Sequence, residues 1–276
     1  MIFIYSKWKK FCQELNKKNI ISIPACEVQS SLDKYLVLKH DVETKVSHAY
    51  KLARIEHLNG HCGSYYVQAY LLDNQKNVRL LKEMQAMGHE ISYHYDVMDS
   101  NKGDIEKALV EFEGNLDKFR SNGFDIKTVC QHGNPIVERK GYNSNRDFFR
   151  DYSVNEKYQD ISDIMVNFKE KKGTEYLYFS DAGRKFKLIY DPINNDIVDS
   201  SDKDKVVKNL DELTTIVCQD GRYIVSIHPH RWTNSRILYL LKSGTFKMIR
   251  VVAKLLIKVP FMKKIFSKYY YLANNI

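Results

Sequence analysis

Histidine and acidic side chains recur directly after the short apolar runs of this sequence. The runs YLVLK, EISY, IKTVCQ, YLYF and YIVSI are followed by candidate ligands or acid–base groups, namely His40, Asp41, Glu43, His94, Asp96, His132, Asn134, Asp181, His228 and His230. Imidazole nitrogens and carboxylate oxygens, without thiolate, suit Zn²⁺ or a similar divalent ion in an open hydrolytic site. Such an ion lowers the pKa of bound water to about 7 and polarises a carbonyl. A lone histidine in such a position is more often structural, but recurrence after five runs predicts a functional site.

The elements that must position these side chains follow from the pattern of apolar residues. We expect strands at 35–39, 64–68, 90–93, 126–131, 176–179, 186–190 and 223–227, and helices at 49–58, 78–87, 104–119 and 203–217. Repeated strand–helix order predicts an α/β fold with a mostly parallel sheet, either open or closed into a barrel. The carboxyl ends of parallel strands share one face, so the polar side chains are expected at one mouth. Residues 134–174 are rich in polar and charged residues and are expected to form loops or an insertion.

Several motifs at these strand ends resemble those of the polysaccharide deacetylase family, which includes chitooligosaccharide deacetylases. The segments are HDVE at 40–43, GHEISYH at 88–94, SDAG at 180–183 and SIH at 226–228, and the resemblance spans roughly residues 35–235. It implies a deformed (β/α) barrel of about seven strands that removes N- or O-acyl groups from sugars with a divalent metal. The chain resembles a divergent branch found among surface-polysaccharide biosynthesis enzymes.

The resemblance also implies roles for individual residues. His94 would bind the metal, Asp41 would act as general base and Glu43 as the metal carboxylate. His228 would be the general acid that protonates the leaving group, and Asp181 would orient the catalytic side chains.

Two positions depart from the family pattern. The second metal histidine of the family corresponds to Met98, whose thioether is a poor ligand for such an ion. We expect His132 to complete the site, with Asp41 as the alternative. The family's third motif carries an Arg near a Pro, whereas residues 130–135 read CQHGNP, so the usual arginine support for the base is missing.

Further residues near the strand ends are expected to contact the sugar. The expected substrate-binding residues are Asn134, Asp181, His230, Arg231 and Trp232. Trp232 could offer an aromatic face for stacking, and a packing role is the alternative. The remaining histidines, His48, His57, His61 and His89, are expected to serve packing or surface roles. His40 should point away from Asp41 because adjacent side chains of a strand face opposite sides.

Charge is distributed very unevenly along the 276 residues. Residues 221–276 hold 11 Lys or Arg and no acid, which leaves 32 basic against 34 acidic residues in the first 220. Nucleic acid is not an expected partner because a nucleic-acid enzyme more often carries its basic residues around the active site. Basic and apolar residues alternate at helical spacing after 236, as in a helix lying on an anionic membrane surface. The alternative is a terminal helix packed on the domain with a solvated basic face.

These features predict two parts, a catalytic (β/α) barrel at 1–235 and a basic amphipathic membrane-associating tail at 236–276. Five scattered cysteines, without a Cys-x-x-Cys pair, favour a reducing compartment. With no secretory signal or apolar span recognised, we expect a cytoplasmic enzyme, peripheral at the inner face of the cell membrane.

The expected activity is zinc-type hydrolysis of an acetyl group from an acylated sugar or a lipid-linked oligosaccharide. One alternative is hydrolysis of another small amide, such as an N-formyl group on a sugar. Another is a non-catalytic glycan-binding relative that has lost its metal.

Overall fold

A single sheet with seven parallel strands forms the centre of the molecule. The structure, a computed structural model, describes residues 3–29, 31–134, 137–170, 176–181, 186–189 and 205–256. The strands are β1 (Tyr35–Val42), β2 (Gly63–Val67), β3 (Glu90–Tyr95), β4 (Thr128–Gln131), β5 (Ser162–Asp163), β6 (Leu177–Ser180), β7 (Lys187–Ile189), β8 (Lys205–Val206) and β9 (Arg222–Ile227). Their order is β5-β4-β3-β2-β1-β9-β6-β7-β8, with parallel pairing from β5 to β6 and antiparallel pairing of β7 and β8.

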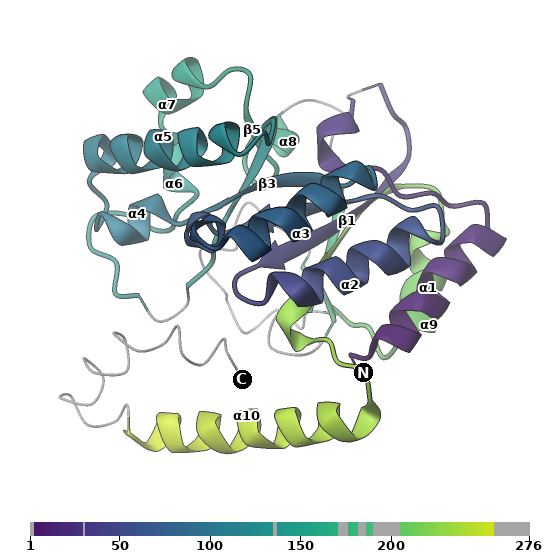
Figure 1. Cartoon of the computed structure of the whole chain (residues 1–276). Helices are drawn as coiled ribbons and strands as arrows, with labels where there is room; N and C mark the ends of the chain where they lie inside the picture. Colours follow the sequence, from purple (N-terminus) through teal and green to yellow (C-terminus); the bar gives the residue numbers. More distant parts are fainter. Residues whose placement is uncertain are drawn as a thin grey trace.

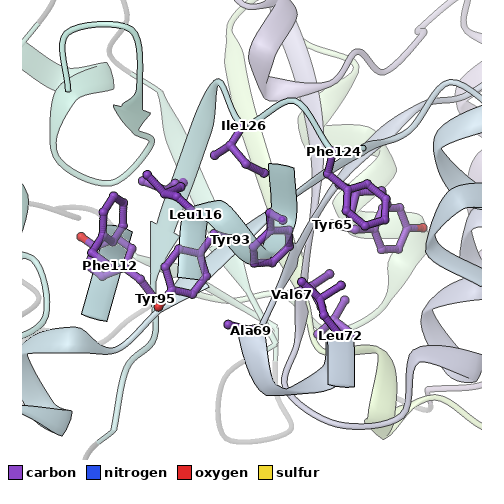
Figure 2. Close-up of a cluster of buried hydrophobic side chains, with 14 of the residues drawn as sticks. Tyr65, Val67, Ala69, Leu72, Tyr93, Tyr95, Phe112, Leu116, Phe124 and Ile126 are labelled. Carbon is purple, nitrogen blue, oxygen red and sulfur yellow. The ribbon is translucent and has the colours of Figure 1, made fainter. Parts of the chain in front are cut away.

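Helices cover the outer face of this sheet (Figure 1). The longer helices of the domain are α1 (Tyr5–Lys17), α2 (Val46–His57), α3 (Gln75–Ala86), α5 (Ile105–Ser121) and α9 (Leu210–Val217). Shorter turns are η1 (Ala25–Glu27), η2 (Ala69–Asp73), α4 (Val97–Ser100), α6 (Asp147–Arg150), α7 (Tyr152–Lys157), α8 (Asn167–Glu170) and η4 (Pro229–Arg231). Figure 2 shows part of the aromatic-rich core that joins β2 and β3 to α5, where the rings of Tyr93 and Phe112 lie 5.4 Å apart.

Strand β1 lies in the middle of the parallel part and is buried along its whole length. Successive side chains of a strand point to opposite faces. Leu36 and Leu38 therefore pack in the outer core beneath α1 and α9, whereas Tyr35 and Val37 pack in the inner core. The same alternation sends Asp41 to the inner face and His40 to the outer face.

The sheet is curled into a half-barrel. The segments next to β5 and β6, the outermost of the parallel strands, meet on the inner face. There Ile164 and Phe168 share one apolar cluster with Tyr176 and Tyr178. The hydroxyl of Tyr176 donates a hydrogen bond to the carbonyl of Ile164 at 2.7 Å. The predicted α/β fold with a mostly parallel sheet is thus confirmed, and the curl is compatible with the expected deformed barrel.

The structure corrects the start of the last helix of the domain and adds a helix near residue 5. Residues 205–206 pair with β7, so the helix expected at 203–217 begins only at Leu210. Asn209 sets that start because its side chain accepts a hydrogen bond from the amide of Glu212, which caps the helix. Helix α1, which the sequence pattern did not predict, packs on α2 and α9 and supplies Trp8 and Phe11 to the outer core.

The C-terminal part is described only as far as residue 256. It forms α10 (Arg236–Leu256), and the remaining part of the expected tail, 257–276, lies outside the described residues. No helix in the described ranges is both long and apolar enough to cross a bilayer.

A buried carboxylate, Glu56 of α2, ties the outer face of the sheet to the helices. It accepts hydrogen bonds of 2.8 Å from the indole of Trp8 and from the hydroxyl of Tyr65, and lies 3.0 Å from Nε2 of His40. Gly63 of β2 lies against this network. A Cβ at Gly63 would come within 2.7 Å of the Leu38 carbonyl oxygen and 3.2 Å of a Glu56 oxygen.

We therefore predict that Gly63→Ala destabilises the fold, by about 1–3 kcal/mol, because a backbone oxygen of the central strand must move. Gly114→Ala is the matched control, since a Cβ there, in the middle of α5, meets nothing within 4 Å. That variant should gain about 0.5–1 kcal/mol from helix propensity. Chemical denaturation measures both changes, and equal effects of the two variants would contradict the packing described here.

Candidate metal centre

Five of the predicted residues meet at the carboxyl ends of the parallel strands. Asp41 is the last residue but one of β1, Glu43 follows β1, His94 lies on β3, His132 follows β4 and His228 follows β9. The Nε2 atom of His228 lies 3.5 Å from Oε1 of Glu43 and 3.8 Å from Oδ2 of Asp41. The Nε2 atom of His132 lies 3.4 Å from Oε1 of Glu43.

Two groups of three side chains place their ligand atoms within 4.8 Å of one another. The first is Glu43, His94 and His132, and the second is Asp41, His94 and Cys130. Asp41, Glu43, His94 and Cys130 are buried, and His132 is partly buried. Buried imidazole and carboxylate groups gathered in this way could hold a metal ion.

The ring of His94 is held in one tautomer. Its Nδ1 atom lies 3.0 Å from the carbonyl oxygen of Cys130, which can only accept a hydrogen bond, so Nδ1 must carry the proton. The lone pair is then on Nε2, as in metal-binding histidines whose second nitrogen is bound to a carbonyl. Burial lowers the pKa of His94 to about 4, so the ring is neutral at pH 7.

A buried ammonium, Lys39, lies beneath the site and binds Asp41. The Lys39 Nζ atom donates to Asp41 Oδ1, and the Ser226 hydroxyl donates to Asp41 Oδ2 at 3.2 Å. Burial by itself would raise the pKa of Asp41, but Lys39 and the nearby His94 and His228 hold it well below its usual value. Lys39 was not among the predicted site residues, although it shares the strand face of Asp41.

Glu43 is surrounded by histidines. Burial would raise the pKa of Glu43, but the hydrogen bond from His132 and the charges of His228 and His230 lower it well below normal. The Nδ1 atom of His230 is buried 4.0 Å from Glu43 and has no hydrogen-bond partner among the described residues. Tyr70 donates its hydroxyl proton to the backbone carbonyl of Glu43, a further contact that the sequence did not indicate.

His228 is oriented by Asp181, which follows β6. The Oδ1 atom of Asp181 lies 2.5 Å from Nδ1 of His228, and its Oδ2 accepts the His228 amide at 3.1 Å. Arg231 binds the same carboxylate at 2.8 Å. Burial opposes ionisation, but Arg231 and His228 lower the pKa of Asp181 below its usual value. The Nε2 atom of His228 is thereby turned toward Asp41 and Glu43.

Not all the predicted sugar-binding residues lie in the mouth of the site. Trp232 is fully buried and packs on Phe3 and Trp8, with ring centroids 5.3 and 5.1 Å away. The prediction that its face stacks on a sugar is therefore wrong, and the alternative packing role is confirmed. Arg231 uses its guanidinium on Asp181, and Asn134 lies two residues beyond His132 in a partly buried position.

Met98, where the motif resemblance would call for a second metal histidine, packs in the hydrophobic core with residues of β3 and α5. The region after His132 is more ordered than the sequence indicated, because it contributes α6, α7, β5 and α8. Asn145 in this region donates to the His132 carbonyl at 2.8 Å and to Asp99 at 2.9 Å. It therefore holds the backbone of a candidate ligand.

The other histidines have structural contacts, as predicted. His89 binds the amide of Gly63 and the carbonyl of Ala53, and His61 lies 3.0 Å from the carbonyl of Cys12. His40 is buried on the outer face, stacked on Tyr65.

Comparisons with protein-family models, curated proteins and solved structures find no match to this chain.

Removing the Lys39 ammonium should leave the buried carboxylate of Asp41 without its counter-charge. We predict that Lys39→Met lowers the free energy of unfolding by about 3–5 kcal/mol near neutral pH, because Asp41 loses its main counter-charge. Lys10→Met is the control, since Lys10 pairs with Asp211 on the exposed surface and should have little effect.

The cost of Lys39→Met should also depend on pH in a defined direction. In the wild type the depressed pKa of Asp41 contributes stability above the unfolded pKa of about 4. Without Lys39, burial raises the folded pKa of Asp41 above its unfolded value. The variant therefore loses stability as pH rises from about 4 to the raised folded pKa of Asp41, and the loss is complete above that pKa. Denaturation should show a smaller difference from wild type at about pH 5 than at about pH 8, and a difference that is constant with pH would exclude this account.

Proposed function

We propose that this chain is a metal-dependent hydrolase of the polysaccharide deacetylase type. It would remove an N- or O-acetyl group from a sugar of a surface polysaccharide or its lipid-linked precursor. The observation that carries the proposal concerns His94, whose Nδ1 proton is bound by the Cys130 carbonyl. Its free nitrogen and the ligand atoms of Glu43 and His132 all lie within 4.8 Å of one another. The motif resemblance supports the choice of acyl sugar as substrate.

Glu43, His94 and His132 are the preferred ligands. Asp41 is less suited because it is bound to Lys39 and Ser226. Burial raises the pKa of the Cys130 thiol, so the thiolate needed for binding is unfavourable. Two imidazoles and a carboxylate form a set that zinc accepts, and we propose zinc as the ion.

Asp41 and His228 are the proposed acid–base pair. When bound, a divalent ion makes water more acidic and polarises the acyl carbonyl. Asp41, kept ionised by Lys39, accepts a proton on the carboxylate oxygen that faces His228. Asp181 keeps the His228 ring in place, so that Nε2 points toward the site and can donate a proton to the departing amine or alcohol.

The first test is the metal content of the purified protein, by elemental analysis, for wild type, His94→Ala, His132→Ala and His228→Ala. We expect near-stoichiometric zinc in the wild type and in His228→Ala, and loss of zinc in the other two. His57→Ala, an exposed histidine bound to the Met87 carbonyl, is the matched control. Wild-type protein that takes up no divalent ion would contradict the proposal and favour the non-catalytic glycan-binding alternative.

Acetate release from N- and O-acetylated oligosaccharides tests the reaction itself. His228→Ala should lower kcat by about 10²–10⁴-fold because it removes the general acid. Release of formate from N-formyl sugars, without acetate release, would support the alternative substrate.

Asp181→Asn tests whether Asp181 acts through His228. The variant should lower kcat by about 10²-fold or more, because an amide can present its donor to Nδ1 and favour the wrong tautomer. Zinc content should remain that of the wild type. A fall in kcat that simply follows the loss of folded protein, measured by thermal unfolding, would assign Asp181 a structural role.

A further inference from the structure

Helix α10 exposes a row of large apolar side chains. Ile237 is 74% exposed, Leu240 55%, Leu241 64% and Met248 64%. Four such residues on one helix face are unusual for a surface helix of a soluble domain, whose apolar face normally lies against the core. In Figure 1, α10 runs along the bottom of the view, apart from the helices that cover the sheet.

The side of α10 that meets the domain is a different one. Tyr239 is buried and its ring packs edge-on against Phe3, with centroids 5.8 Å apart, and Lys242 and Ser243 are partly buried. At 100° per residue, these three positions lie opposite Ile237 and Leu241. The described part of α10 therefore contacts the domain through Tyr239, and its row of exposed apolar side chains faces away from that contact.

The charge pattern of the helix identifies what would cover its apolar face. Its sequence contains Arg236, Lys242, Lys247, Arg250 and Lys254 and no Asp or Glu. A second copy of the chain would bring the same basic helix against this one, and the like charges would repel. A lipid surface with anionic headgroups offers both an apolar layer for the leucines and negative charge for the flanking basic residues. Nucleic acid would satisfy the charge but not the apolar side chains.

We propose that α10 lies in the plane of an anionic lipid bilayer, with Ile237, Leu240, Leu241 and Met248 inserted into the interfacial region. Because α10 begins five residues after Arg231, which binds Asp181, the candidate metal centre is then held close to the bilayer. Docking on lipid stands independently of the proposed hydrolysis.

Co-sedimentation of the full chain with vesicles tests this docking. Wild-type protein should bind vesicles of phosphatidylglycerol and phosphatidylcholine and not vesicles of phosphatidylcholine alone. The double variant Ile237→Glu/Leu241→Glu should weaken binding by at least about tenfold, because two apolar side chains no longer enter the bilayer. Val110→Glu is the matched control, since Val110 of α5 is 72% exposed on a different surface and its substitution should leave binding unchanged.

Three results would overturn the proposal: no binding of the wild type to anionic vesicles, equal binding by the double variant, or equal weakening by Val110→Glu. Sedimentation velocity without lipid tests whether a second copy of the chain covers this face instead. If the wild type is a dimer and the double variant is a monomer, the face belongs to a dimer interface. Zinc content should be the same in wild type and double variant. Loss of vesicle binding with intact zinc therefore separates failure of the docking surface from failure of the metal centre.

Discussion

The buried pair of Lys39 and Asp41 is the interaction on which the arrangement of the site depends. Both side chains are on the inner face of the central strand and are almost entirely removed from solvent. Transferring two charges into the interior is costly, and their mutual attraction offsets the cost only when the geometry is good. Ser226 from the neighbouring strand completes the hydrogen bonding of the pair, so β1 and β9 are joined by polar contacts as well as by the backbone ladder. The rings of Tyr66 on β2 and Tyr178 on β6 also face the ammonium, with centroids 5.7 and 5.9 Å from Lys39 Nζ.

The outer face of the same strand packs against a second buried carboxylate, which has no ammonium partner among the described residues. There the charge centre is Glu56 of α2, and it is met by neutral donors, the Trp8 indole and the Tyr65 hydroxyl, together with His40. No lysine takes part among its described contacts. This network connects α1, α2, β1 and β2, whereas the inner pair connects only strands. One network thus fixes the helices to the sheet, and the other sets the electrostatics of the mouth.

The sequence revealed the strand-end residues because their positions follow from local pattern. An apolar run that ends in His or Asp places that side chain at the mouth of any parallel sheet, so His94, His132 and His228 could be found without knowing the curl. Lys39 was missed although strand alternation puts it on the same face as Asp41, two residues later. The sequence does not show that this face is closed to solvent, and that closure is what makes the pair a buried one. Trp232 was misassigned because burial depends on Phe3 and Trp8, which are distant in sequence. The boundary of α9 depends on pairing of 205–206 with β7, a contact that periodicity does not encode.

The beginning of the chain is fastened to the start of α10 through backbone contacts. The amide of Tyr5 donates to the carbonyl of Thr233 and the amide of Thr233 to the carbonyl of Phe3, which forms a parallel bridge. Helix α1 follows this bridge directly, while η4 and His228 precede Thr233 by a few residues. A tilt of α10 is therefore not borne by one flexible connection. The bridge between Ile4 and Thr233 also holds α1, so a displacement of the last helix would act on the segment of His228 and on the first helix together.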